Sequence, residues 1–106
     1  MLDNTKPNKK LGQNFLINEY TINTILEILD IKPEDSVLEV GPGHGALTKN
    51  IVKKTKNYIG VEKDKNLSNL LKEKYKNNID IRNEDILKIN LKEIFLNNYR
   101  VVGNIP

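Results

Sequence analysis

The stretch V-L-E-V-G-P-G-H-G, residues 37–45, constrains the fold more than any other part of this sequence. A short apolar run, typical of a buried strand, passes directly into a turn with three glycines and then into a helical pattern. Glycine closes tight turns and lets a bound group approach the main-chain N–H groups closely. The alternative is a tight turn without a ligand. The order strand, glycine turn, helix favours an α/β domain that binds a ligand at this turn.

Helices and strands alternate along the rest of the chain. Periodicity predicts strands over residues 36–40, 57–62, 79–82 and 99–105, and helices near 19–30, 46–55 and 91–96 and from a cap at Asp64 to about Lys76. Asn18 is the expected N-cap of the first helix. Strands separated by helices form parallel sheets with right-handed crossovers, so we expect a Rossmann-like α/β fold. Doubly wound sheets continue beyond a fourth strand, so we expect residues 1–106 to be the N-terminal part of a longer domain.

Polar residues follow each later strand of the predicted sheet. Glu62 ends the second strand 21 residues after Gly41, and a carboxylate at that spacing can bind the ribose hydroxyls of a nucleoside. Asp85 follows the third strand and is placed to accept a hydrogen bond from an adenine amine. Asn104 and Pro106, in N-I-P, follow the fourth strand and offer an amide and a backbone carbonyl oxygen to an amine. The alternatives are a polar strand end, a helix cap and a proline turn. This pattern predicts a nucleoside-containing cofactor and leaves NAD and S-adenosylmethionine open.

Basic residues concentrate in the middle of the chain. The formal net charge is +3, and residues 49–76 hold nine lysines against three acidic residues. Lys49, Lys53 and Lys54 are candidate contacts to nucleic-acid phosphates. The alternative is a set of solvated helix faces in a chain rich in Asn, Lys and Ile, a bias typical of AT-rich genomes.

Several classes of chemistry are not expected. The chain has no Cys and one His, which argues against disulfides, thiolate chemistry and a metal site. His44 lies between two glycines, which favours a loop residue over a catalytic base, and neither Ser36 nor Ser68 lies in a G-x-S-x-G turn. No apolar run approaches the roughly 20 residues of a membrane span. The N-terminus has no apolar core like that of a signal peptide. We therefore expect a cytoplasmic protein that binds neither metal nor membrane.

Together with L-G-Q-N-F-L at residues 11–16, these segments resemble the ribosomal RNA adenine dimethyltransferase family. The resemblance extends from Leu11 to Pro106. It implies S-adenosylmethionine as the cofactor and seven residues as its contacts: Asn14, Leu16, Gly41, Glu62, Asp85, Ile86 and Asn104.

Each of these contacts has an implied role in the family. Asn14, Leu16 and Gly41 would lie against the methionine end of the cofactor, and Glu62 would hold the ribose hydroxyls. Asp85 would bind the adenine amine, with the neighbouring Ile86 packing on the ring.

The implied reaction transfers methyl groups twice to the exocyclic amine of an adenine in small-subunit rRNA. That adenine must leave its stack to reach the site. Asn104 and the Pro106 carbonyl would accept the amine hydrogens. The sequence G-P-G-H-G-A-L-T, from Gly41 to Thr48, is more similar to that of the small-subunit branch of the family than to that of the erythromycin-resistance branch.

One departure from the family concerns its N-[IL]-P-Y motif, because this sequence ends at Pro106. The aromatic residue that would stack on the flipped base is not in it, and such stacking is worth about 1–3 kcal/mol. The remaining sheet and a helical C-terminal domain are also outside these residues. We therefore expect the 106-residue chain alone to be catalytically impaired.

Several alternatives remain open at this point. One is a non-catalytic RNA-binding or ribosome-assembly factor, and another is a large-subunit methyltransferase of the erythromycin-resistance type. An NAD-binding domain and a gene remnant are further alternatives. The oligomeric state is also open.

Overall fold

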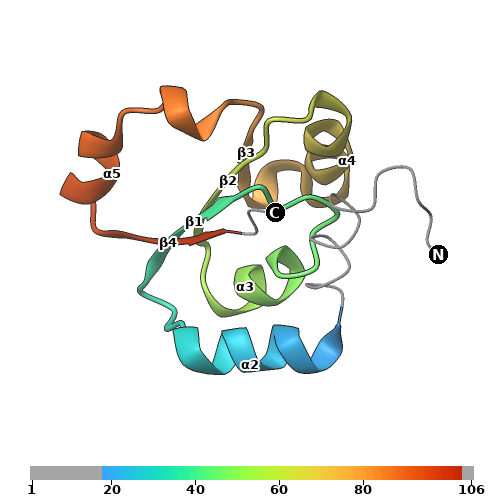
Figure 1. The fold of residues 1–106 in the computed structure, drawn as a ribbon, viewed down its shortest axis with the longest axis vertical. Coiled ribbons are helices and arrows are strands. Elements are labelled where there is room, and N and C mark those ends of the chain that lie inside the picture. The colour runs from blue at the N-terminus through green and yellow to red at the C-terminus, as the bar shows by residue number, and fades with distance from the viewer. Residues whose placement is uncertain (1–17, 104–106) are drawn as a thin grey trace.

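The four predicted strands form one parallel sheet (Figure 1). The structure is a computed structural model and describes residues 18–103. The strands are β1 (Ser36–Val40), β2 (Asn57–Val61), β3 (Asp80–Arg82) and β4 (Tyr99–Gly103), in the order β3-β2-β1-β4. All three neighbouring pairs are parallel, which confirms the Rossmann-like α/β class.

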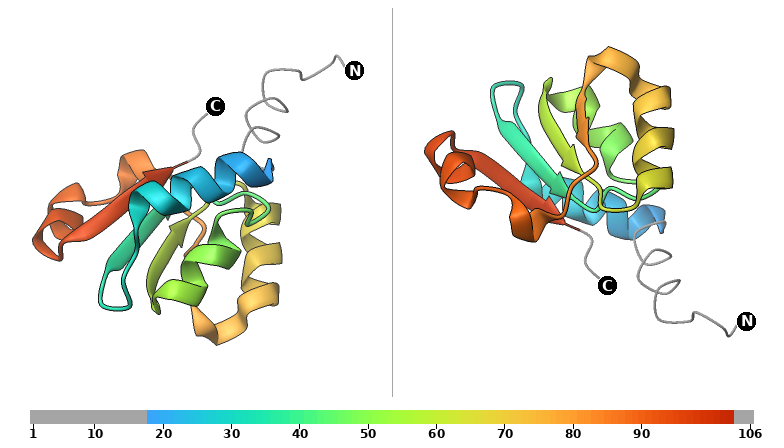
Figure 2. Two further views of the ribbon diagram at one scale, coloured as in Figure 1. Left: turned by 90° about the horizontal axis from the view of Figure 1, so that it is seen from below. Right: turned by 90° about the horizontal axis from the view of Figure 1, so that it is seen from above.

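Helices cover the two faces of the sheet unequally (Figure 2). One face carries α2 (Glu19–Leu29), α3 (Thr48–Lys54) and α4 (Lys65–Tyr75), and a 3-10 turn, η1 (Lys76–Asn78), follows α4. The other face carries the short helix α5 (Leu91–Leu96) and a second 3-10 turn, η2 (Ile86–Lys88).

The alternation of side chains along the strands separates two apolar clusters. Val37, Tyr58 and Ile81 point toward α2, α3 and α4, where they join buried residues of the larger cluster: Ile22, Ile31, Leu47, Ile51 and Leu71. Leu38 and Val61 point to the opposite face and pack against Ile94 of α5. The larger cluster therefore lies between the sheet and three helices, on the face from which the glycine turn enters α3.

Most of the predicted boundaries are confirmed to within one or two residues. The Asn18 side chain accepts from Thr21 N (3.1 Å) and the Asp64 side chain accepts from Leu67 N (3.0 Å), so both predicted N-caps are confirmed. The helix expected over 46–55 begins at Thr48, because residues 43–47 are in turns. The spacing of Leu67, Leu70 and Leu71 predicts one inward apolar stripe on α4, but Leu70 is 57% exposed.

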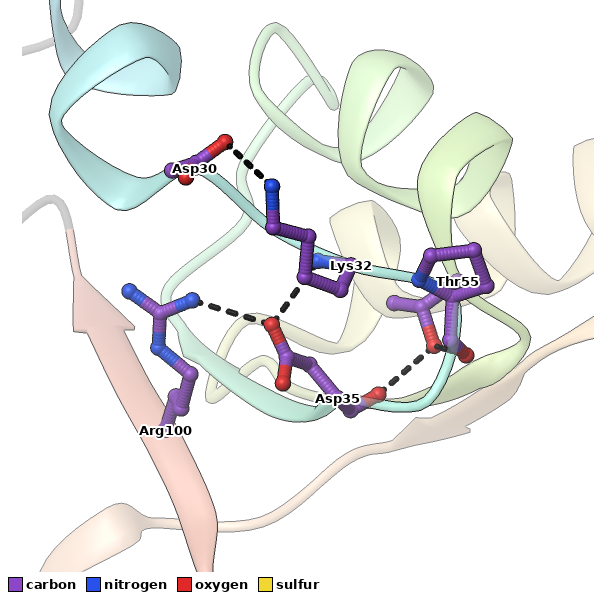
Figure 3. Close-up of polar contacts among 6 residues, drawn as sticks. Asp30, Lys32, Asp35, Thr55 and Arg100 are labelled. Carbon is purple, nitrogen blue, oxygen red and sulfur yellow. Dashed lines mark hydrogen bonds and ion pairs between the residues drawn. The ribbon is translucent and has the colours of Figure 1, made fainter.

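A polar clasp at the amino edge of the sheet joins segments that are far apart in sequence (Figure 3). Asp35 Oδ2 accepts from the backbone N–H of Lys32 (2.8 Å) and from the Arg100 guanidinium (3.1 Å). The Thr55 hydroxyl donates toward the carbonyl oxygens of Asp35 (2.7 Å) and Pro33 (3.1 Å). The clasp therefore ties the turn before β1 to the residues before β2 and to the edge strand β4.

This clasp should make stability depend on acid pH. The Lys32 N–H and then Arg100 hold the pKa of Asp35 below its ordinary value of 3.8. The unfolded chain therefore binds the proton more readily, and the stabilisation present above about pH 4 is lost as pH falls through the folded pKa. We expect Asp35→Asn to reduce the difference between the urea midpoints at pH 7 and pH 3. Glu34→Gln, at an exposed acid in the same turn, is the control and should leave that difference as in the parent chain.

Candidate functional site

The residues predicted to bind a ligand follow the carboxyl ends of the strands. The glycine turn follows β1, Glu62 follows β2, and Asp85 lies three residues beyond β3. Because all four strands are parallel, these ends lie at one edge of the sheet, the usual ligand-binding edge of an open α/β fold.

The glycine turn has a backbone shape that only glycine adopts readily. Gly43 and Gly45 have φ angles of 59° and 88°, in the left-handed region. A Cβ atom on Gly45 would also lie 3.3 Å from Cδ2 of Leu71 on α4. Gly41 has φ 67°, and its N–H donates to the Val61 carbonyl (2.9 Å), which extends the contact between β1 and β2 into the turn.

Glu62 is buried and joins the glycine turn to the start of α4. Its Oε1 accepts from Gly43 N (2.9 Å) and its Oε2 accepts from Asp64 N (2.9 Å), while the residue is 6% exposed. An ionised carboxylate offers about four acceptor positions, so each oxygen retains one for a ligand. A carboxylate fixed in this way can accept two hydroxyl hydrogens from a vicinal diol.

Glu39, on β1, is a buried carboxylate that the sequence analysis missed. Its Oε1 accepts from the Tyr58 hydroxyl (2.6 Å) and from the Thr48 hydroxyl (2.7 Å), and the residue is 1% exposed. Burial raises the pKa of Glu39, and burial together with the Glu39 charge raises the pKa of Tyr58. The available signal was an acidic residue inside the buried run S-V-L-E-V, where an unpaired charge would be costly.

Asp85 has a local structural contact. Its Oδ1 accepts from Leu87 N (3.0 Å) and caps η2, and its Oδ2 lies 4.0 Å from Lys63 Nζ. Asp85 therefore acts as a helix cap, which was the alternative to a ligand contact. A contact between its Oδ2 and an adenine amine stays a prediction. Ile86 is half-buried against the cluster of Leu38, Val61 and Ile94. Its packing on an adenine ring also stays a prediction.

Asn83 is a second residue that the sequence analysis missed. Its side-chain amide donates to the carbonyl oxygens of Glu62 (2.9 Å) and Lys63 (3.0 Å). It therefore fixes the loop after β3, which leads to Asp85, against the loop after β2.

The other residues singled out from the sequence have different standings. Asn14, Leu16, Asn104 and Pro106 are outside the described residues 18–103. His44 is exposed in the turn and borders a hollow of about 100 Å³ beside α4. Three lysines, Lys49, Lys53 and Lys54, are exposed on α3.

Two kinds of feature are absent from residues 18–103. No group of three His, Asp or Glu residues gathers as a metal site within 18–103. Over the same range, no helix has the length and apolarity that crossing a membrane requires.

Comparisons with known proteins give consistent similarities. The family described as Ribosomal RNA adenine dimethylase matches residues 4–106. The Ribosomal RNA small subunit methyltransferase A of Malacoplasma penetrans is 48% identical over 99 residues, covering 92% of this chain and 36% of the relative. The protein of the same name in Clostridium botulinum is 42% identical over 105 residues, covering 95% and 38%. The chain therefore spans little more than a third of the length of these relatives.

Two solved structures share the fold. A dimethyladenosine transferase from Plasmodium falciparum superposes with a TM-score of 0.69 at 25% identity, covering 84% of this chain and 32% of that one. The 23S rRNA methyltransferase ErmE superposes with a TM-score of 0.62 at 33% identity, covering 69% and 31%.

Proposed function

The chain belongs to the ribosomal RNA adenine dimethylase family, and from this premise we propose that its residues form the S-adenosylmethionine-binding part of an rRNA adenine dimethyltransferase. The observation that carries the proposal is the contact between Glu62 and Gly43. It places a buried carboxylate with spare acceptor positions directly beside a glycine turn.

The residues at the sheet edge fit a nucleoside with a polar tail. Glu62 would accept both ribose hydroxyls, and Asp85 would accept the adenine amine while Ile86 packs on the ring. Gly41, Asn14 and Leu16 would lie along the methionine end. The cofactor, when bound, supplies a methyl group already activated on a sulfonium, so the chain's task is to orient it and to exclude water.

The substrate amine would be held at the end of β4. Asn104 and the Pro106 carbonyl would accept its hydrogens and align its lone pair with the methyl group. The proposed substrate is an adenine of small-subunit rRNA, turned out of its stack. This site would follow the carboxyl end of β4, and that end lies beside the end of β1, where the glycine turn starts, because β4 pairs with β1.

The first experiment is thermal unfolding of the chain with S-adenosylhomocysteine. A ligand that binds only the folded state stabilises it by about 2.7 kcal/mol at a hundredfold excess over Kd. We expect a rising midpoint with S-adenosylhomocysteine and no change with NAD, which shares the adenosine moiety. An equal rise with NAD, or no rise with either ligand, would contradict the proposal.

RNA binding should depend on Lys49 and Lys53 more than on Lys54. Lys49 and Lys53 are four residues apart and therefore share one face of α3. Lys54 instead lines a cleft together with two residues of opposite charge, Glu27 of α2 and Asp30, the C-cap of that helix. We expect the double variant Lys49→Gln, Lys53→Gln to bind an rRNA fragment with a shallower slope of log affinity against log salt concentration. The decrease in slope should correspond to the loss of about two phosphate contacts. Lys54→Gln is the matched control, and an equal effect of both variants would reject this surface.

A further inference from the structure

The Tyr58 side chain crosses from β2 to β1 over a glycine. The register pairs Tyr58 with Val37 and Gly60 with Glu39, so Glu39 lies two residue pairs further along the sheet, on the same face. The Tyr58 hydroxyl nevertheless reaches Glu39 Oε1 at 2.6 Å. A Cβ atom on Gly60 would lie 2.7 Å from that hydroxyl oxygen, so the path of the phenol requires glycine at position 60.

Glu39 ties together the two ends of the glycine turn. It lies two residues before Gly41, and the same Oε1 accepts from Thr48, the first residue of α3 (2.7 Å). The Tyr58 and Thr48 hydroxyl oxygens are themselves 3.4 Å apart. One buried carboxylate oxygen therefore connects the strand before residues 41–47 to the helix after them.

The tip of the turn has its own attachment, the contact from Gly43 N to Glu62. The two ends of the turn are held by Glu39 instead. A buried carboxylate keeps a single position only while hydrogen-bond donors surround it. Tyr58 supplies one of the two hydroxyl donors on Oε1. Without it, we expect Glu39 and Thr48 to shift, and the turn to lose the shape fixed by its left-handed glycines.

We propose that Tyr58 is a positioning residue which, through Glu39 and Thr48, holds the glycine turn in its ligand-receiving conformation. The identity of that ligand, S-adenosylmethionine, rests on the function proposed above. The positioning itself is a property of the ligand-free chain.

The test compares Tyr58→Phe with Tyr75→Phe in the full 106-residue chain. Tyr75 is a fitting control because its buried hydroxyl has no hydrogen-bond partner among residues 18–103. Amide hydrogen exchange at Gly43, Gly45 and Ala46 is measured without ligand, relative to the amides of β1 and β2. S-adenosylhomocysteine affinity is measured by calorimetry.

We expect Tyr58→Phe to speed exchange in the turn about tenfold more than in the strands and to weaken binding about tenfold. Tyr75→Phe should do neither. Thr48→Val should reproduce the effect of Tyr58→Phe, and Thr48→Ser should preserve the parent behaviour. This second pair decides the question if Tyr58→Phe does not fold.

Two results would overturn the inference. One is parent-like turn exchange and affinity in both Tyr58→Phe and Thr48→Val. The other is faster exchange spread equally over the turn and the strands, which a merely structural role would produce. If the parent chain does not bind S-adenosylhomocysteine, the proposed function fails, while the exchange rates still decide the positioning role.

Discussion

Replacing Glu62 with alanine should weaken S-adenosylhomocysteine binding by at least a hundredfold. Hydrogen bonds to a charged acceptor contribute about 1.5–3 kcal/mol each, so losing two ribose contacts costs about 3–6 kcal/mol. Every 1.4 kcal/mol is a factor of ten in affinity. The substitution also leaves Gly43 N and Asp64 N without their carboxylate, so the turn loses the attachment at its tip.

Two further variants separate ligand contact from turn geometry. In Glu62→Gln the side-chain shape is kept, and its single oxygen can accept from only one of the two N–H groups, so we expect an intermediate loss. Glu84→Ala removes an exposed acid just before Asp85 and should bind like the parent chain. Calorimetric titration measures all three variants. A Glu62→Ala chain that binds within fivefold of the parent would remove Glu62 from the site.

Replacing Gly60 with alanine should destabilise the fold by about 3–5 kcal/mol. The new Cβ would lie 2.7 Å from the Tyr58 hydroxyl oxygen and 2.9 Å from Ile81 Cδ1, and both side chains are buried. Overpacking a core costs about 1–3 kcal/mol. Displacing a hydroxyl from a buried carboxylate adds about 1.5–3 kcal/mol. Such a loss is a large fraction of the 5–15 kcal/mol typical of a folded domain.

Urea unfolding followed by circular dichroism measures this cost, and a double-mutant cycle tests its cause. In a Tyr58→Phe background the closest contact is absent, so the same Gly60→Ala change should cost clearly less. The contacts with Ile81 Cδ1 (2.9 Å) and with the ring carbon Cε1 of residue 58 (3.1 Å) remain in both backgrounds and set the residual cost. An equal cost with and without the Tyr58 hydroxyl would show that the hydroxyl is not what excludes a side chain at position 60.

The strands and the glycine turn could be predicted because their signals are local. Val37 and Leu38 belong to an apolar run, and Gly43 and Gly45 mark the turn that follows it. Asn18 and Asp64 mark helix starts, because each side chain accepts from a backbone N–H three residues later. Glu62 could be proposed from its spacing to Gly41. Its backbone contacts to Gly43 N and Asp64 N could not, because they depend on how two loops meet.

The residues that were missed act over long separations. Glu39 meets Tyr58 and Thr48 only after β1, β2 and α3 have packed together, and no short-range pattern marks these partners. Asn83 is equally hidden, since it contacts backbone carbonyl oxygens about 20 residues earlier. Leu70 was expected to be buried but is exposed. Helical periodicity predicts which residues share an apolar face, but not how much of that face the neighbouring elements cover.

The parallel pairing of β1 with both β2 and β4 also governs the order in which the chain can assemble. Ser36 pairs with Asn57 on one side and with Tyr99 on the other, sequence separations of 21 and 63 residues. Closing the longer loop is entropically costlier, and folding slows as native contacts become less local. During synthesis, β1 and β2 can pair first, and the second edge of β1 stays open until residue 103 has left the ribosome. Of the two interior strands of the described sheet, β1 is therefore paired on both sides later than β2, and its open edge is a point at which the nascent chain is exposed to misassociation.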